Sequence, residues 1–397
     1  MWPRRSRASA SSSVERKAPP VEAPQTNNSL RLTIADSTDL RLVTRSWSRG
    51  AGFEIETADL SGVGARSLFG VMCTYQRPDS VQVALEAIGR QSLSPDLLVV
   101  VDNDDDPAVR ELVEGQTSVR AAYVGVRPNG GPAGAFNIGL FALPEPHDDD
   151  LVVLFDDDDP PMADDSIRRL VDRLDELAAT ADDISGVGLH GGLFDINHGR
   201  VRPPVGDSGI VSVDHLHGYA LPVYRRKALQ QVGGFDTEVF WGFEELELGC
   251  RLNSAGHGLV VDMDHWNEVA ERYPKAGDRR GIQFAVGPPS SGRYYSLRNL
   301  LRVLGRQRAW WAIAEVVMVR AIGKPLAGMV IHPRMAMSSL AVNVLAISDA
   351  VRGRMGRRDR FPRVCGLAVS GAVPGRSVAQ KSSTSPRLSR SSERAGA

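Results

Sequence analysis

Residues 151–161 read LVVLFDDDDPP, five apolar residues followed by four aspartates and two prolines. An unbroken apolar run of this length is typical of a strand that is buried on both faces of a parallel sheet. Four adjacent carboxylates at the end of such a strand repel one another unless a cation lies among them, because unpaired charge is unfavourable away from water. Carboxylate oxygens suit Mg²⁺ or Mn²⁺. We therefore expect a divalent metal site at Asp156–Asp159, with a solvated acidic turn as the alternative.

The segments around this run alternate between strand and helix patterns. Apolar runs predict strands at residues 67–74, 97–101, 121–126 and 151–155, and amphipathic spacing predicts helices at 79–91, 108–114 and 134–142. Short links between a strand, a helix and the next strand require parallel pairing. The pattern therefore predicts an α/β fold with a mostly parallel central sheet flanked by helices. Polar groups that follow the strands then meet at one edge of the sheet, where ligands bind in such folds.

The composition allows a large core and gives no sign of a nucleic-acid partner. The chain has 397 residues, of which 42% are hydrophobic and 24% charged, and its formal net charge is -1. A nucleic-acid-binding domain usually carries a basic excess, so we expect no such partner. Cys73, Cys250 and Cys365 lie far apart without CxxC spacing. This spacing argues against a disulfide framework and a zinc site, and it fits a reducing cytosol.

Changes in composition divide the chain into five parts. Residues 1–28 are rich in Ser, Ala, Arg and Pro and lack the apolar run of a signal peptide, so we expect a disordered tail there. An N-terminal extension at 29–66 precedes the main α/β domain at 67–300. A helical accessory region is expected at 301–355 and a disordered basic tail at 356–397.

Three more strand ends carry polar groups suited to a nucleotide diphosphate. Asp102 and Asn103 offer an acceptor and an amide for a base or ribose, or they form an Asx turn that caps the next helix. Arg77 either pairs with phosphate or decorates a loop. The segment RPNGGPAGAFNIG at 127–139 places glycines directly before a helix. Its backbone N–H groups either approach a ligand closely or form a plain helix start.

Taken together, residues 69–301 resemble glycosyltransferase family 2, a family of inverting enzymes with the GT-A fold that use nucleotide-diphosphate sugars. VMCTYQRPD at 71–79 looks like the turn of the family's first βαβ unit, and FDDDDPP at 155–161 looks like its Asp-x-Asp metal motif. The resemblance implies that Asp156 and Asp158 bind the metal, in a register uncertain by one residue. It implies that contacts to the nucleotide sugar come from Thr74, Arg77, Asp102, Asn103, Asn129, Gly130 and Asp157.

The segment FWGFEELELGCRL at 240–252 is similar to the region in which this family carries its catalytic base. The family commonly has an Asp there, whereas this chain has Glu245, with Glu244 as the alternative. Such a carboxylate removes the proton of an acceptor hydroxyl as the nucleotide diphosphate leaves from the opposite face of the sugar. Acidic residues in a first helical turn are also what an ordinary helix start favours.

Two later features extend the resemblance. His265 follows an apolar strand near the place where many GT-A enzymes carry a metal-binding His, although a packing role suits it equally. Residues 293–299, RYYSLRN, resemble a segment of bacterial members that use rhamnosyl or galactofuranosyl donors. They either contact phosphate or acceptor, or they anchor the following helix. His215 and His217 lack zinc-like spacing and are interpreted as part of a polar loop.

The resemblance implies a metal-dependent inverting glycosyltransferase that uses Mg²⁺ or Mn²⁺. It would move a sugar from a nucleotide-diphosphate donor to a hydroxyl of a cell-envelope glycan or lipid-linked acceptor. The alternatives are a nucleotidyltransferase and a non-catalytic glycan-binding protein of the same fold. A second acidic cluster, Glu244–Glu247, favours sugar transfer.

The region after Leu301 combines apolar helical faces with basic residues. This combination suits either a packed accessory subdomain or attachment to an anionic bilayer surface. No segment reaches the roughly 18–20 uncharged apolar residues that span a bilayer, and the nearest is Met335–Ile347. We therefore expect a cytoplasmic enzyme that attaches peripherally to the inner face of the cell membrane.

Overall fold

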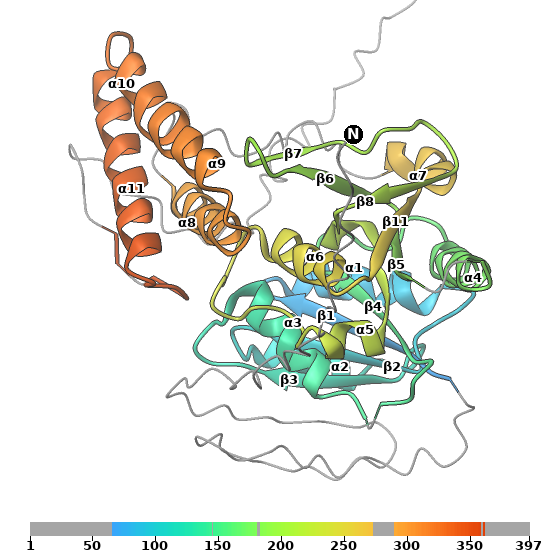
Figure 1. Ribbon diagram of the computed structural model, residues 1–397. Coiled ribbons are helices and arrows are strands. Elements are labelled where there is room, and N and C mark those ends of the chain that lie inside the picture. The colour runs from blue at the N-terminus through green and yellow to red at the C-terminus, as the bar shows by residue number, and fades with distance from the viewer. Residues whose placement is uncertain (1–65, 145, 181–182, 273–289, 359, 362–397) are drawn as a thin grey trace, which may run out of the picture.

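The computed structural model describes residues 66–144, 146–180, 183–272, 290–358 and 360–361. The expected tail at 1–28, nearly all of the extension at 29–66 and most of the basic tail at 356–397 lie outside these residues. The described part contains two sheets, the helices that cover them and a group of C-terminal helices (Figure 1).

The larger sheet has eight strands in the order β3, β2, β1, β4, β10, β5, β11, β8. Strands β3, β2, β1 and β4 are mutually parallel, as are β5 and β11, whereas β10 and β8 run antiparallel to their neighbours. The predicted α/β fold with a mostly parallel central sheet is therefore confirmed. The strands are β1 Leu68–Thr74, β2 Leu97–Asp102, β3 Ala121–Gly125, β4 Leu151–Asp156, β5 Ile184–Gly188, β8 Ile210–Val213, β10 Val223–Arg225 and β11 Gly258–Asp262.

A second sheet of three antiparallel strands, in the order β7, β6, β9, contacts the larger sheet at β5, β8 and β11. Its strands are β6 Gly191–Asp195, β7 Arg200–Arg202 and β9 His215–Leu216. A short 3-10 turn, η1 Gly218–Ala220, follows β9 and leads into β10. This turn carries the chain from the small sheet back to the centre of the large one.

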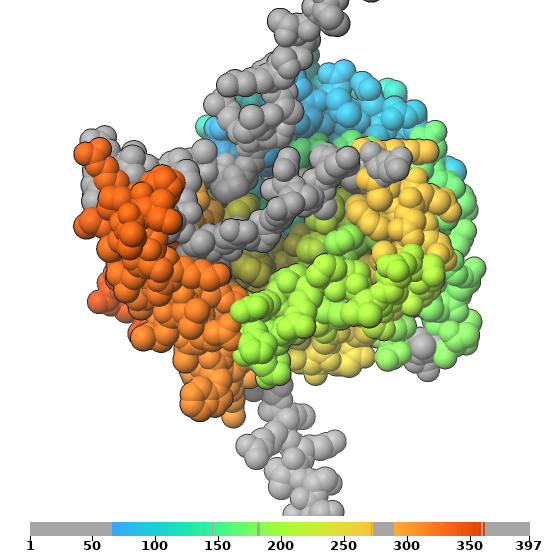
Figure 2. Space-filling model, turned by 90° about the horizontal axis from the view of Figure 1, so that it is seen from above, coloured from blue at the N-terminus to red at the C-terminus, as the bar shows by residue number. Residues whose placement is uncertain are grey.

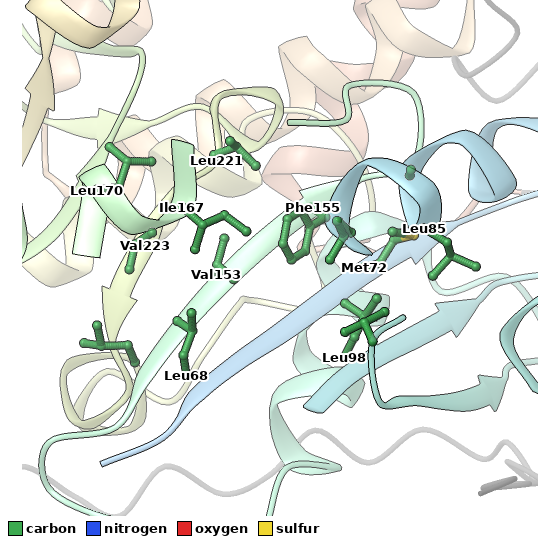
Figure 3. Packing of buried hydrophobic residues seen from close by; sticks show 14 of the residues in the cluster. Leu68, Met72, Leu85, Leu98, Val153, Phe155, Ile167, Leu170, Leu221 and Val223 are labelled. Carbon is green, nitrogen blue, oxygen red and sulfur yellow. The ribbon is translucent and has the colours of Figure 1, made fainter. Parts of the chain in front are cut away.

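Helices cover both faces of the larger sheet. Leu151, Val153 and Phe155 of β4 pack on one face with α1, α2 and α4, and Val152 and Leu154 pack on the other with α3, α5 and α6. Figure 3 shows the first of these cores around Val153 and Phe155. Burial on both faces explains why this strand is apolar throughout. The helices are α1 Pro78–Gly89, α2 Pro107–Glu114, α3 Gly131–Phe141, α4 Ser166–Ala178, α5 Arg226–Gln231, α6 Glu244–Ser254 and α7 Met263–Val269, with a 3-10 turn η2 Ala270–Arg272.

The C-terminal helices share a separate apolar core, which Phe240 of the sheet domain joins. They are α8 Ser291–Arg306, α9 Trp310–Glu315, the π-helical segment η4 Val316–Gly323, α10 Lys324–Gly328 and α11 Pro333–Val351. Figure 1 shows α9, α10 and α11 as a hairpin that extends away from the sheet domain. Helix α11 has 19 residues and is, by length and composition alone, long and apolar enough to cross a membrane. It extends beyond the run Met335–Ile347 because it includes Arg334 and Asp349, so it is not a span of uncharged apolar residues.

Candidate functional site

The four aspartates form a turn at the end of β4. Asp156, Asp158 and Asp159 each offer one carboxylate oxygen, and these three oxygens lie within 4.8 Å of one another. Asp157 is engaged differently, because it accepts hydrogen bonds from Thr74 Oγ1 and Arg77 Nη1, both at 2.7 Å. Arg77 also lies 2.8 Å from Asp158 Oδ2. The three grouped oxygens are a donor set that fits a hard divalent cation such as Mg²⁺ or Mn²⁺.

Charge repulsion in this turn also favours a cation. Burial raises the pKa of Asp156 well above its usual value, and the carboxylates of Glu245, Asp158 and Asp159 raise it further. Burial raises the pKa of Asp157 to about 6, although Arg77 opposes the rise. A positive charge among the carboxyl groups would stabilise their ionised forms. The buried setting therefore suits a metal site better than a solvated acidic turn.

The carboxyl ends of four parallel strands meet around this turn. Thr74 is in register with Asp102, Asp102 with Gly125, and Cys73 with Asp156. The polar groups that the sequence places after separate strands are thus brought to one edge of the sheet. This edge is where α/β folds bind ligands.

The Asp102 carboxylate is satisfied within its own turn. It accepts hydrogen bonds from the backbone N–H groups of Asp104 and Asp106, at 3.0 and 2.6 Å, and from the Tyr123 hydroxyl at 3.0 Å. Burial raises the pKa of the Asp102 carboxyl, although these hydrogen bonds oppose the rise. The Asx turn, one of the two interpretations of this residue, therefore describes Asp102. Arg77 and Thr74 likewise contact Asp157, so the protein itself occupies the groups that the resemblance assigns to the nucleotide.

Two asparagines hold the glycine-rich loop. Asn103 Oδ1 accepts from the backbone N–H of Gly130 at 3.1 Å, and Asn129 Oδ1 accepts from that of Gly131 at 2.7 Å. Gly131 has φ of +73°, and a Cβ there would lie 2.0 Å from the carbonyl oxygen of Phe240. Only glycine fits such a position. The loop that precedes α3 therefore packs directly on the segment that precedes α6, which joins the two halves of the site.

Helix α8 holds the loop before α6 in a conformation that non-glycine residues rarely adopt. Phe240 and Phe243 have φ of 66° and 68°. Arg298 Nη2 donates to the Val239 carbonyl at 3.0 Å. The fully buried Asn299 donates its side-chain amide to three carbonyls of this loop, at 2.8 to 3.0 Å, those of Val239, Trp241 and Gly242. The RYYSLRN segment lies inside α8, and its last two residues fix the backbone that presents Glu244 and Glu245, a role that neither interpretation of the segment included.

Glu244 and Glu245 begin helix α6 with different surroundings. Glu245 Oε1 accepts from the Gly218 N–H at 2.5 Å, and its Oε2 lies 3.8 Å from His217 Nδ1. Burial opposes ionisation of Glu245, but His217 and the Gly218 N–H outweigh it and lower the pKa. Burial and the charge of Glu245 raise the pKa of Glu244, whose Oε2 has no hydrogen-bond partner among the described residues. Glu245 is thus the member of the pair that is ionised at neutral pH, as a proton acceptor must be.

The Glu245 carboxylate and the aspartate turn face the same space. A Cβ on Gly218 would lie 2.8 Å from Glu245 Oε1 and 3.3 Å from Asp156 Oδ2. The charge of Glu245 is also the largest effect after burial on the pKa of Asp156. Two acidic clusters almost 90 residues apart in the sequence therefore form one site.

A stack of rings stands beside Glu245, and the sequence did not reveal it. The His217 ring stacks on those of His190 and Tyr219, each with centroids 5.1 Å apart, and meets that of His215 edge-on at 5.0 Å. The Trp266 ring contacts His190 at 5.0 Å. The available signal was the spacing of two between His215, His217 and Tyr219, which directs side chains to one side of an extended segment. The polar-loop interpretation of the two histidines missed this packing.

The chain is similar to a known protein family and to named proteins of two organisms. The model described as Glycosyl transferase family 2 matches residues 71–212. Galactofuranosyltransferase GlfT1 of Mycobacterium tuberculosis is 30% identical over 256 residues, which cover 60% of this chain and 83% of that protein. The chain belongs to glycosyltransferase family 2. Galactofuranosyltransferase GlfT1 of Mycolicibacterium smegmatis is 47% identical over 70 residues, which cover 18% of this chain and only 23% of that relative.

Solved glycosyltransferase structures are also similar to this family 2 member. Mannosyltransferase PcManGT from Pyrobaculum calidifontis, in complex with GDP-Man and Mn²⁺, has 17% identity and a TM-score of 0.41, over 72% of this chain and 75% of that one. TarS 1-349 of S. aureus, in complex with UDP-GlcNAc, has 13% identity and a TM-score of 0.43, over 72% and 83%. Membership of the family makes the chain a glycosyltransferase with the GT-A fold, which sets aside the nucleotidyltransferase alternative.

His265 does not lie among the three grouped aspartate oxygens. Its ring is fully buried with Nε2 3.3 Å from Ser166 Oγ of α4, and its backbone N–H donates to Asp262 at 2.9 Å. Burial lowers its pKa. The structure therefore does not bring this predicted metal ligand together with the aspartate turn, because α7 starts directly after β11 and packs the ring against α4.

Proposed function

We propose that this glycosyltransferase is a metal-dependent inverting galactofuranosyltransferase that acts on a hydroxyl of a cell-envelope glycan or lipid-linked acceptor. The approach of Glu245 to Asp156 beside Gly218 is the observation that carries the proposal. An inverting transfer needs a base on one side of the reacting sugar and stabilisation of the departing diphosphate on the other. The two carboxylate groups are close enough to serve one bound donor.

Glu245 is the base in this proposal. Its lowered pKa keeps the carboxylate ionised at neutral pH, whereas Glu244 has a raised pKa. The Gly218 N–H and His217 hold the two carboxylate oxygens, so the group is oriented before an acceptor binds. A positioned base of this kind contributes about 100-fold to 10,000-fold to the rate.

Asp156 and Asp158, together with Asp159, would hold Mg²⁺ or Mn²⁺. Such an ion supplies charge neutralisation for the departing diphosphate. Arg77 pairs with Asp157 and Asp158 and so fixes the turn that presents these oxygens. The glycine-rich loop, whose Gly130 and Gly131 N–H groups donate to Asn103 and Asn129, lies near the same edge of the sheet, where it would contact the nucleotide sugar.

Two observations support a galactofuranosyl donor. The relatives that align with this chain carry the name galactofuranosyltransferase. The RYYSLRN segment at 293–299 resembles bacterial members that use galactofuranosyl or rhamnosyl donors. UDP-galactofuranose is therefore the proposed donor and dTDP-rhamnose the second candidate.

Release of nucleotide diphosphate from UDP-galactofuranose, dTDP-rhamnose and UDP-glucose tests this proposal. Each donor is offered with Mn²⁺, Mg²⁺ or EDTA, with and without a hydroxyl-bearing envelope glycan as acceptor. We expect acceptor-dependent release from UDP-galactofuranose with either metal and none in EDTA, and a product whose anomeric configuration by NMR is opposite to that of the donor. Release from dTDP-rhamnose alone would make dTDP-rhamnose the donor. Full activity in EDTA would refute the metal requirement, and a product with the configuration of the donor would refute inversion.

A further inference from the structure

The C-terminal hairpin ends in an exposed apolar tip. Its first arm runs through α9, η4 and α10, its second arm is α11, and residues 329–332 join them. Within that connection, Val330 and Ile331 expose 90% and 74% of their surface. Leu326, one turn earlier on α10, is exposed as well. We define residues 326–334 as the hairpin tip.

Exposed apolar side chains continue from the tip along both arms. Trp311 and Met318 on the first arm are seven residues apart, as are Met337, Val344 and Val351 on α11, and all five are exposed. On α11, a spacing of seven keeps these side chains on one side of the helix. Large apolar side chains gathered in the open on one hairpin indicate a surface that contacts a partner.

The charges of the hairpin indicate which partner fits. No Asp or Glu occurs between Glu315 and Asp349 in the sequence, a stretch that contains Arg320, Lys324 and Arg334. Lys324 lies two residues before the hairpin tip, Arg334 is its last residue, and both are exposed. Apolar side chains flanked by exposed cations, with no acidic residue among them, are typical of segments that insert into an anionic lipid surface.

Helix α11 is packed into the protein along its other side. Asn343, fully buried, donates to the Ala321 carbonyl of the first arm at 2.8 Å. Tyr294 of α8 donates its hydroxyl to the buried Asp349 at 2.7 Å. These buried polar contacts would be lost if α11 left the hairpin to cross a bilayer, so the structure favours docking at a surface over spanning it.

The hairpin tip and a hollow over the part of the chain that includes α6 face the same side of the molecule. The hairpin tip points upward in Figure 1, and Figure 2 looks down from that side. Figure 2 shows a hollow between the orange hairpin and the light-green segment that contains β6 and β7. The floor of this hollow has the olive and yellow colours of the part of the chain that includes α6. A surface that touches the tip would therefore lie above the opening of the hollow.

We propose that the hairpin tip docks on the surface of a bilayer that contains anionic phospholipid, at the inner face of the cell membrane. Val330 and Ile331 insert among the headgroups, and Lys324 and Arg334 contact lipid phosphates. The observations that support docking all come from the hairpin. The consequence of docking, that the site opens toward a lipid-linked acceptor, rests on the proposed function.

Flotation of the full chain with vesicles tests the docking without any substrate. The vesicles are phosphatidylcholine alone or phosphatidylcholine with phosphatidylglycerol. We expect binding to the anionic vesicles, weakened about tenfold by Val330→Asp and about fivefold by each of Lys324→Ala and Arg334→Ala. The matched control is Val205→Asp in the sheet domain, where a Val is 81% exposed, and it should bind as the unchanged chain does.

Three results would overturn the docking. The first is that the unchanged chain fails to bind anionic vesicles. The second is that Val330→Asp binds them as well as Val205→Asp does, which would mean that another segment supplies the contact. The third is that Val330→Asp converts a dimer to a monomer in light scattering and still binds vesicles, because the tip would then be an interface between copies. Nucleotide release is measured separately, so loss of that activity would count against the proposed function and not against docking.

Discussion

The carboxylates of Asp156 and Glu245 both lie against the α-carbon of Gly218. A methyl group there would be 3.3 Å from Asp156 Oδ2 and 2.8 Å from Glu245 Oε1. Neither carboxylate is near the other in sequence, and the turn between β9 and β10 brings them together. A side chain at residue 218 would therefore require the Glu245 carboxylate to shift.

Replacing Gly218 by Ala should therefore lower turnover without unfolding the protein. The added methyl group is closer to Glu245 Oε1 than real contacts allow, so the carboxylate must move away from its hydrogen bond with the backbone N–H. We expect a decrease of about tenfold or more in kcat for nucleotide release. Gly305→Ala is the matched control, because a Cβ at Gly305 meets nothing within 4 Å. Equal activity of both variants would show that the contact does not matter.

Metal binding should release protons. Burial and neighbouring carboxylates raise the pKa of Asp156 well above its usual value, so a cation there competes with a proton at a higher pH than at an ordinary aspartate. Affinity for Mn²⁺ should therefore rise as the pH rises. Titration calorimetry in two buffers of different ionisation enthalpy measures the release, and Asp156→Asn should abolish it. Heats that are the same in both buffers would contradict this assignment.

Loss of the Asn299 amide should release the loop that carries the base. Asn299→Ala leaves the carbonyls of Val239, Trp241 and Gly242 without this donor in a buried setting. We expect the free energy of unfolding to fall by about 2–4 kcal/mol, measured by urea denaturation. The control is Asn253→Ala, which removes one exposed hydrogen bond to the Asp214 carbonyl and should change stability little. An equal loss of stability in Asn299→Ala and Asn253→Ala would show that Asn299 does not anchor this loop.

The imidazole of His217 should orient the base without binding the donor. His217→Phe keeps a ring between His190 and Tyr219 but removes the nitrogen 3.8 Å from Glu245 Oε2. We expect kcat to fall about tenfold because the base loses a neighbour that orients it, while the Kd for UDP is unchanged. Steady-state kinetics and calorimetry with UDP separate the two quantities. A rise in Kd with unchanged kcat would place His217 at the donor instead.

The sheet could be predicted from the sequence because burial on both faces leaves a strong local signal. The run at 151–155 differs from β4 by a single residue. Helix α3 begins at Gly131 and not at 134 because Pro132 fits the first turn of a helix and extends it toward the N-terminus. Strand β10 has no periodic pattern of its own, since its three residues are too few for one and its partners β4 and β5 are distant in sequence.

Candidate site residues could be predicted where they form a pattern within one segment. Contacts between two segments could not. The aspartate run and the Glu244–Glu245 pair are local patterns. The contact of His217 with Glu245 and that of Gly131 with Phe240 join segments more than 25 residues apart, so spacing alone could not reveal them. The engagement of Arg77 by Asp157 depends in the same way on the pairing of β1 with β4.

Turnover of Glu245→Gln, measured together with its Mn²⁺-dependent binding of UDP, tests the central claim most directly. The account predicts UDP binding within about twofold of the unchanged chain and a loss of turnover of about 100-fold or more, with Glu244→Gln as the matched control that keeps turnover. Full turnover of Glu245→Gln, with loss of turnover in Glu244→Gln, would contradict the account and make the neighbouring glutamate the base.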